Sequence, residues 1–199
     1  MKKDLPAIVA EILGNRAPVL IEDREGLYRH AAVLVPLFND GGEYKLLFTK
    51  RTRQVEAHKG QISFPGGGVE EADGSYEETA LREAYEEIGL LPGDVKILGR
   101  TDDSLTMTSN YMIHPFVGLI PYPYDFRINT REVKTLIRVP VRVFLEKGAG
   151  GGVVPVEYEG RTYEGYAYRY DGEVIWGATA RIMVNFVEIL GQSLITSRS

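Results

Sequence analysis

Three glutamates spaced for one face of a helix are the residues best placed to do chemistry. Glu83, Glu86 and Glu87 lie three and four residues apart, within a segment whose apolar residues Leu81, Ala84 and Ile88 recur at helical intervals. At helical pitch, the three carboxylates share a side that is separate from the apolar stripe. Like charges at these spacings repel each other, so a compensating cation is expected. Oxygen-rich clusters of this kind suit Mg²⁺ or Mn²⁺.

The elements around these acids have recognisable ends. Ser75 followed by Glu78 is a capping-box pattern, which predicts the start of the helix. Gly89 predicts its end, and Pro92 prevents its continuation. Residues 65–68 read Pro-Gly-Gly-Gly, which predicts a turn without bulky side chains that lets the backbone approach a ligand or ion closely.

An acid-rich helix face can also be a solvated surface with no further role. The glycine run, the cap and Arg82 favour a site instead. Arg82 is the natural counter-charge that orients Glu86, four residues on, or a neighbouring carboxylate, and we place it among the catalytic candidates.

The segment from Gly68 to Leu90 resembles the signature of the Nudix hydrolase family, a loop–helix–loop that binds divalent cations. The matching residues are Gly68, Arg82, Glu83, Glu86, Glu87 and Gly89. The general signature has Glu where this chain has Gly74.

A narrower resemblance accounts for this departure. Residues 46–67 are similar to the upstream motif of the coenzyme A pyrophosphatase branch, which commonly carries an Asp at the place of Asp73. The residues that match this motif are Arg51, His58, Gly60, Phe64, Pro65, Gly66 and Gly67. Thr52, Val55 and Glu70 are mild departures from it. Residues 106–118 and 175–182 also resemble segments of this branch.

The resemblance implies a site for Mg²⁺ or Mn²⁺. We expect Glu83 and Glu87 to be the principal ligands, with Glu86 as a further ligand or as an acid that supports them. A backbone carbonyl of the glycine run, from Gly67 or Gly68, would complete the shell. Nudix enzymes draw their general base from the signature or from a distant loop, so Glu86 and Glu132 are both candidates.

Four positions are candidates for contact with the substrate. Arg51 is interpreted equally well as a phosphate ligand or as the ion-pair partner of a signature carboxylate. His58 either binds substrate or holds the loop before Phe64. Gly66 and Gly67 would bring the backbone close to the substrate. A structural role is expected for His114.

The leading hypothesis is hydrolysis of a phosphoanhydride bond, most specifically in coenzyme A or its derivatives, to 3′,5′-ADP and a 4′-phosphopantetheine product. ADP-ribose or another nucleoside diphosphate derivative is the alternative substrate. A different class of function, a non-catalytic nucleotide-sensing module, is disfavoured because such modules often lose acids that this chain keeps.

Composition limits the partners. A net charge of −5 argues against a general nucleic-acid binder, and the longest apolar runs are too short to span a membrane. The absence of cysteine excludes disulfides and zinc–thiolate sites and is compatible with the cytoplasm. A small nucleotide-derived substrate is the expected partner, and a homodimer is compatible with the sequence.

The chain of 199 residues fits one domain, with residues 1–30 as an N-terminal helical extension. Strands are expected at 30–38, 44–51, 61–64, 95–102, 113–121, 132–139, 153–158 and 161–170, and a last helix at about 177–190. Mixed strands with few helices favour an α+β protein. The resemblance implies the same fold, a Nudix-type α/β/α sandwich with a mixed central sheet.

Overall fold

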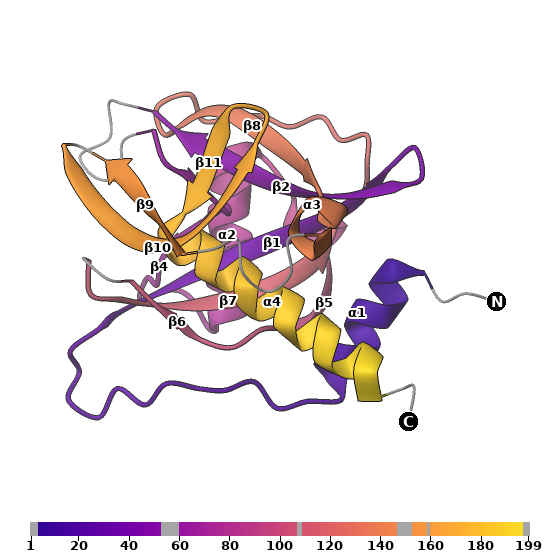
Figure 1. Ribbon diagram of the computed structural model, residues 1–199, viewed down its shortest axis with the longest axis horizontal. Helices are drawn as coiled ribbons and strands as arrows, with labels where there is room; N and C mark the ends of the chain where they lie inside the picture. Colours follow the sequence, from indigo (N-terminus) through magenta and orange to yellow (C-terminus); the bar gives the residue numbers. More distant parts are fainter. Residues whose placement is uncertain (1–3, 53–59, 107–108, 147–152, 159, 197–199) are drawn as a thin grey trace.

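The computed structural model describes residues 4–52, 60–106, 109–146, 153–158 and 160–196 (Figure 1). The first half of the chain contains α1 (Leu5–Gly14), β1 (Arg29–Asp40), β2 (Glu43–Arg51), β3 (Ile62–Ser63), β4 (Gly66–Gly68), α2 (Tyr76–Ile88), the 3₁₀ turn η1 (Pro92–Asp94) and β5 (Lys96–Arg100). The second half contains β6 (Ser104–Leu105), β7 (Tyr111–Leu119), β8 (Val133–Pro140), α3 (Val141–Glu146), β9 (Val153–Tyr158), β10 (Arg161–Tyr170), β11 (Glu173–Trp176) and α4 (Gly177–Thr196).

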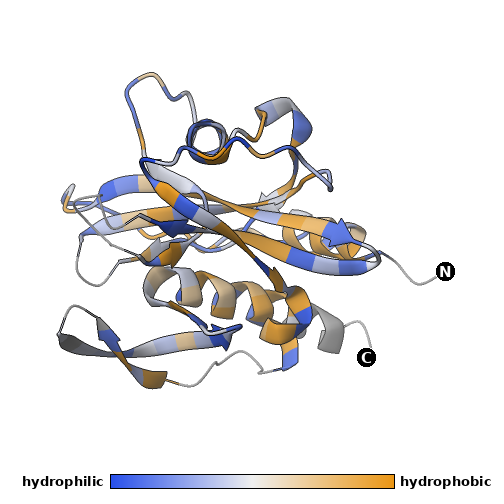
Figure 2. Ribbon diagram, turned by 90° about the horizontal axis from the view of Figure 1, so that it is seen from above, coloured by the Kyte–Doolittle hydropathy of each residue, from blue (hydrophilic) through white to orange (hydrophobic). Residues whose placement is uncertain are grey.

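The central sheet contains both strand directions. Its order is β3-β2-β1-β7-β5, with β4 paired to β1, β6 to β7 and β8 to β2. β1 and β7 run parallel, whereas β1 pairs with β2 and with β4 in antiparallel fashion. Helices cover both faces of this sheet (Figure 2). The predicted α+β sandwich with a mixed sheet is therefore confirmed.

Strand periodicity creates two separate cores. Successive side chains of a strand point to opposite faces, so alternate residues of β1 enter different clusters. Ala32 and Leu34 pack with Ala84 of α2 on one face, whereas Val35 and Leu37 join the cluster that α4 covers on the other. Ala84 and Ile88 of the predicted apolar stripe thus dock α2 on the sheet, whereas Ala80 and not Leu81 is the third α2 apolar residue of this core.

A polar network fastens the first turn of α2 to the sheet. His114 of β7 is only 3% exposed, and its Nδ1 lies 2.8 Å from Asp103 Oδ1. Its Nε2 lies 3.0 Å from His30 Nδ1 on β1. The ring of Tyr76, the first residue of α2, stacks on His114 with 3.7 Å between centroids. The structural role expected for His114 agrees with this packing.

Outside the central sheet, β9, β10 and β11 form a small antiparallel sheet. The predicted hairpin of β9 and β10 is confirmed, whereas β11 and α3 were not predicted. The helix of the N-terminal extension spans only Leu5–Gly14, and residues 15–28 form no helix or strand and run along the molecule (Figure 1). Within the described ranges, no helix is both long enough and apolar enough to cross a membrane.

Candidate active site

Local contacts define both ends of the helix that carries the acids. Ser75 Oγ accepts a hydrogen bond from the Glu78 amide at 3.1 Å, and Glu78 Oε2 accepts one from the Gly74 amide at 2.9 Å. Gly89 adopts the left-handed conformation, with φ 68°. Both predicted ends of α2 are therefore confirmed, although Glu78 reaches back one residue further than in a standard capping box.

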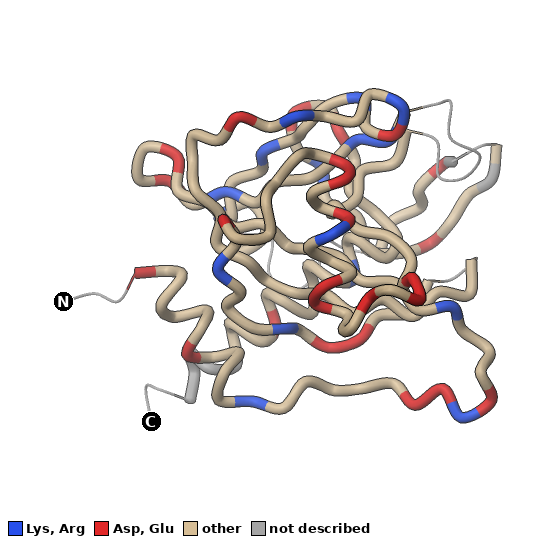
Figure 3. The backbone as a smooth tube through the Cα atoms, turned by 180° about the vertical axis from the view of Figure 1, so that it is seen from behind, with Lys and Arg blue, Asp and Glu red and all other residues tan. Residues whose placement is uncertain are grey.

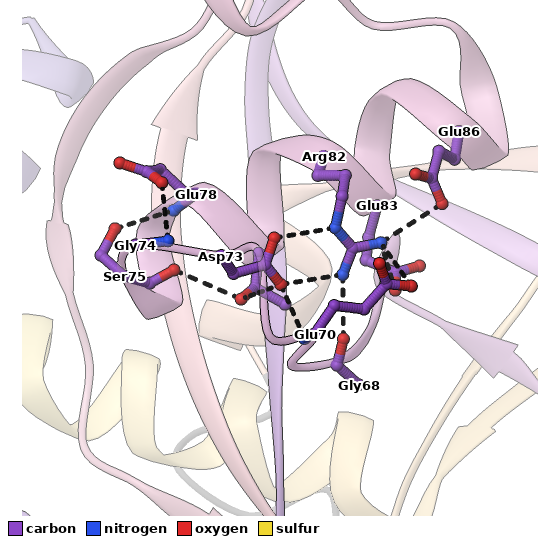
Figure 4. Close-up of polar contacts among 10 residues, drawn as sticks. Gly68, Glu70, Asp73, Gly74, Ser75, Glu78, Arg82, Glu83 and Glu86 are labelled. Atoms are coloured by element: carbon purple, nitrogen blue, oxygen red, sulfur yellow. Dashed lines mark hydrogen bonds and ion pairs between the residues drawn. The ribbon is translucent and has the colours of Figure 1, made fainter.

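Arg82 connects the acidic groups through a single guanidinium (Figure 4). Its Nε and Nη2 donate to the two carboxylate oxygens of Asp73 at 2.9 and 3.0 Å. Nη2 also donates to the Gly68 carbonyl at 2.9 Å. Nη1 lies 3.0 Å from Glu83 Oε1 and 3.3 Å from Glu86 Oε2. One planar cation thus links the loop before α2 to two acids of the helix, and a catalytic role for Arg82 remains a prediction.

Asp73 is the partner that holds Arg82 most firmly. Its side chain is 5% exposed and also accepts hydrogen bonds from Thr79 Oγ1 and the Glu70 amide, both at 2.9 Å. The hydrogen bonds from Arg82 hold the pKa of Asp73 far below its usual range, against the effect of burial. Sequence reasoning did not name Asp73 as a site residue. The available signal was its place beside Gly74, where the general signature has an acid.

The glycine run is a short strand rather than only a turn. Residues 66–68 form β4, in which Gly67 pairs with Ala32 of β1. A Cβ on Gly66 would lie 2.4 Å from the Ala32 carbonyl oxygen, and one on Gly67 would lie 2.4 Å from Glu83 Oε1. Glycine therefore lets the strand pass against β1 and against the site acids. The assignment of Gly66 and Gly67 to substrate binding remains a prediction.

Glu87 is buried, which disagrees with the alternative of a purely solvated helix face. Its side chain is 3% exposed and pairs with Arg51, whose Nη1 lies 3.6 Å from Oε1. Burial raises the pKa of Glu87 to about 8, although Arg51 and the Gly66 amide oppose the rise. Glu87 Oε2 and Arg51 Nε are both buried without a hydrogen-bond partner among the described residues. This is the ion pair that one interpretation of Arg51 predicted, and phosphate contact by Arg51 remains a prediction.

Glu83 and Glu132 are close enough to Glu87 for their charges to act on it. Burial raises the pKa of Glu83, whereas the neighbouring Arg82 lowers it. The charge of Glu132 raises the pKa of both Glu83 and Glu87, so the three carboxylates interact. Asn129 Nδ2 donates to Glu132 Oε1 at 3.1 Å. In contrast, the Glu86 side chain is 53% exposed.

These donors fit a divalent cation. Within the described ranges, no three acidic or histidine side chains are already arranged around one point as ligands, and Glu83 is instead bonded to Arg82. Even so, an unpartnered carboxylate oxygen on buried Glu87, beside two further acids, is the oxygen-rich environment that Mg²⁺ and Mn²⁺ prefer. Acidic segments gather in the middle of the face that α2 covers (Figure 3).

Two further predictions concern a substrate contact by His58 and a metal ligand from the glycine run. His58 lies outside the described residues. For the backbone ligand, the Gly68 carbonyl accepts a hydrogen bond from Arg82 and Gly67 pairs with Ala32 of β1, so the assignment of either carbonyl to the cation remains a prediction.

Comparison with known proteins agrees with this fold. A model of the NUDIX domain matches residues 28–150. The "Uncharacterized Nudix hydrolase NudL" of Photorhabdus laumondii is 36% identical over 155 residues, which cover 78% of this chain and 81% of that protein. The crystal structure of a MutT/nudix family protein from Enterococcus faecalis matches with a TM-score of 0.54 at 13% identity, covering 98% of this chain and 71% of that one. That of a MutT protein from Methanosarcina mazei Go1 matches with a TM-score of 0.51 at 16% identity, covering 84% and 95%.

The two crystal structures support the fold, and the domain match and the relative establish the family. The chain belongs to the NUDIX family.

Proposed function

We propose that this chain is a divalent-cation-dependent Nudix hydrolase that cleaves a phosphoanhydride bond in a nucleoside diphosphate derivative. The observation that carries the proposal is the buried, incompletely partnered carboxylate of Glu87 beside Glu83 and Glu132. A buried carboxylate without compensation is costly to maintain, which favours a cation as its partner. Such sites are often functional.

Glu83 and Glu87 would hold Mg²⁺ or Mn²⁺, with Glu86 and the Gly67 carbonyl as further candidates. The cation supplies charge neutralisation on the phosphates and a lower pKa for bound water. Arg82 positions Glu83 through Nη1 while Asp73 fixes the rest of its guanidinium. Arg51, close to Glu87, is placed to contact a substrate phosphate as well.

Of the two candidate bases, we favour Glu132. Its charge acts on both Glu83 and Glu87, whereas Glu86 is largely exposed and paired with Arg82. Asn129 holds one oxygen of Glu132, so the carboxylate is oriented when it takes the proton of the attacking water.

Coenzyme A and its derivatives are the first substrates that we propose, because of the upstream motif from residue 46 to residue 67. ADP-ribose is the alternative within the same chemistry. A screen with CoA, acetyl-CoA, ADP-ribose, NADH and nucleoside triphosphates separates them. Turnover of ADP-ribose without turnover of CoA would remove the branch assignment.

The central test replaces Glu87 with Gln. Mutating a residue that merely hydrogen-bonds a metal ligand commonly lowers metal affinity or activity by about 10- to 100-fold. Because Glu87 is proposed as a ligand itself, Glu87→Gln should lower turnover by about 100-fold or more while the protein stays folded. Calorimetry should show weaker Mg²⁺ binding in the same variant. Glu77→Gln, in the first turn of the same helix, is the matched control and should leave turnover and Mg²⁺ binding unchanged. Undiminished hydrolysis by Glu87→Gln would contradict the placement of the metal.

A further inference from the structure

The loop that leads to Glu132 is bonded to the C-terminal end of α2. The Arg127 amide donates to the Ile88 carbonyl and the Asn129 amide to the Glu87 carbonyl, both at 2.9 Å. A Cβ on Gly89 would lie 2.8 Å from the Arg127 Cβ, so glycine permits this close approach. The last carbonyls of the helix are therefore satisfied by the loop, and the two segments form one unit.

A second set of bonds joins the same loop to η1. Tyr124 Oη accepts a hydrogen bond from the Leu91 amide at 3.0 Å and donates one to Asp94 Oδ2 at 2.8 Å. Between these attachments lies a hollow of about 530 Å³. Its lining residues come from α2 and the residues that follow it, namely Tyr85, Glu86, Gly89 and Leu91, and from the loop before β8, namely Tyr124, Asp125 and Arg127. Because both walls are hydrogen-bonded in place, the hollow is pre-formed.

Its size and lining suit a flat aromatic group. A volume of a few hundred cubic ångströms is typical of ligand sites. The side chains of Tyr85 and Leu91 are each 51% exposed, which leaves an aromatic ring and an aliphatic group available for contact. Nucleobases stack on such rings, and a nearby guanidinium such as that of Arg127 strengthens the stack.

The charged side chains of the hollow suit the polar groups of a nucleoside. Glu86, Asp125 and Arg127 give the hollow an excess of one negative charge. The amino group of a base and the hydroxyls of ribose can donate to these carboxylates, and the guanidinium of Arg127 can donate to a phosphate on the ribose. Glu86 also contacts Arg82, so the hollow adjoins the acids of the candidate active site.

We propose that this hollow binds the nucleoside end of the substrate, with the base against Tyr85 and Arg127 and the ribose toward Asp125. The inference rests on the proposed function, since Glu86 lines the hollow and is linked through Arg82 to Glu83, an acid proposed to bind the cation. It assigns the base and ribose to the C-terminal end of α2 and the phosphates to its middle.

The test compares two ligands that differ only in the base. Adenosine 5′-monophosphate and ribose 5-phosphate carry the same phosphate and have no phosphoanhydride bond to cleave. Calorimetry of the full chain with Mg²⁺ should show about 10-fold tighter binding of the first, in line with the usual worth of a stacked base. Tyr85→Ala should reduce this ratio to near one, and Tyr85→Phe should restore it. Alanine favours a helix at an exposed position, so the fold should persist, as circular dichroism can verify.

Arg127→Ala should also reduce the ratio, whereas Arg142→Ala, which removes an exposed arginine of α3, should not. A ratio near one in the unmodified protein, or an unchanged ratio in Tyr85→Ala, would overturn the inference. The hydrolysis screen separates this failure from that of the proposed function. Hydrolysis by the unmodified protein with no effect of Tyr85→Ala rejects only the hollow, and no hydrolysis of any substrate rejects the proposed function.

Discussion

Replacing Asp73 with Asn tests whether Arg82 depends on the loop before α2. Asn keeps the shape but loses the charge, and its amide N–H groups face a guanidinium that can only donate. Hydrogen bonds to charged groups contribute about 1.5–3 kcal/mol, and breaking a buried ion pair costs about 3–5 kcal/mol. Because Arg82 is 22% exposed, we expect the lower end of that range, about 3 kcal/mol.

For a chain of this size, about 3 kcal/mol corresponds to a fall in Tm of about 6–12 °C, measured by calorimetry or circular dichroism. Turnover should fall as well, because Glu83 loses its fixed neighbour. Asp171→Asn is the matched control, since Asp171 is an exposed turn residue with φ 49°, a conformation that Asn tolerates. A Tm within about 2 °C of the parent would refute the reasoning.

The ion pair of Asp73 and Arg82 also makes the free energy of unfolding depend on pH. Arg82 lowers the pKa of Asp73 in the folded protein, so the unfolded chain binds the proton first as the pH falls. The stability from this group is complete above about pH 4 and is lost as the pH falls through the folded pKa. The difference in unfolding free energy between parent and Asp73→Asn should therefore be constant from about pH 5 to 8 and shrink below about pH 4.

Two further substitutions test other parts of the site. Gly67→Ala should weaken Mg²⁺ binding about 10-fold or more by displacing Glu83, whereas Gly68→Ala, whose Cβ would meet nothing within 4 Å, should leave it unchanged in calorimetry. Burial lowers the pKa of His114 despite the opposing effect of Asp103, so the unfolded chain is protonated first and stability should decline as the pH falls below about 6.5. Denaturant unfolding at several pH values should show a smaller decline in His114→Gln, and an identical decline would contradict the assignment.

The ends of α2 were predictable because they depend on neighbours in the sequence. Ser75 and Gly89 act within a few residues, through a side-chain hydrogen bond and a left-handed backbone. The docking of Ala84 and Ile88 was predictable for the same reason, since helical pitch determines which residues share a face, whereas the choice of Ala80 over Leu81 depends on the packing against the sheet.

The burial of Glu87 was not predictable from its spacing. It depends on β4 and on the loop before β8, which approach α2 through pairings between distant residues. One of these is the hydrogen bond from the Thr52 amide to the Glu132 carbonyl, at 2.7 Å. Helical pitch indicated that Glu83, Glu86 and Glu87 share a side, but only the tertiary contacts make Glu87 buried and Glu86 exposed.

The strand formed by Gly66–Gly68 illustrates the same limit. A run of glycines has little preference for a particular backbone conformation, so its sequence is typical of a turn. These glycines form a strand because they pair with β1. Larger residues do not fit at Gly66 and Gly67 because a Cβ would collide with the Ala32 carbonyl or with Glu83. Asp73 and Arg82, nine residues apart, meet because the capped turn between them folds back.

The bonds between the 127–129 loop and the end of α2 also have a mechanical consequence. Asn129 is hydrogen-bonded both to the Glu87 backbone and to the Glu132 carboxylate. A displacement of Asn129 would therefore move Glu132, proposed as the base, and Glu87, proposed as a cation ligand, together. Inserting residues between Asn129 and Glu132 would uncouple Glu132 from the Glu87 backbone and leave α2 unchanged. Such an insertion should lower the rate of proton removal without lowering the affinity for the cation.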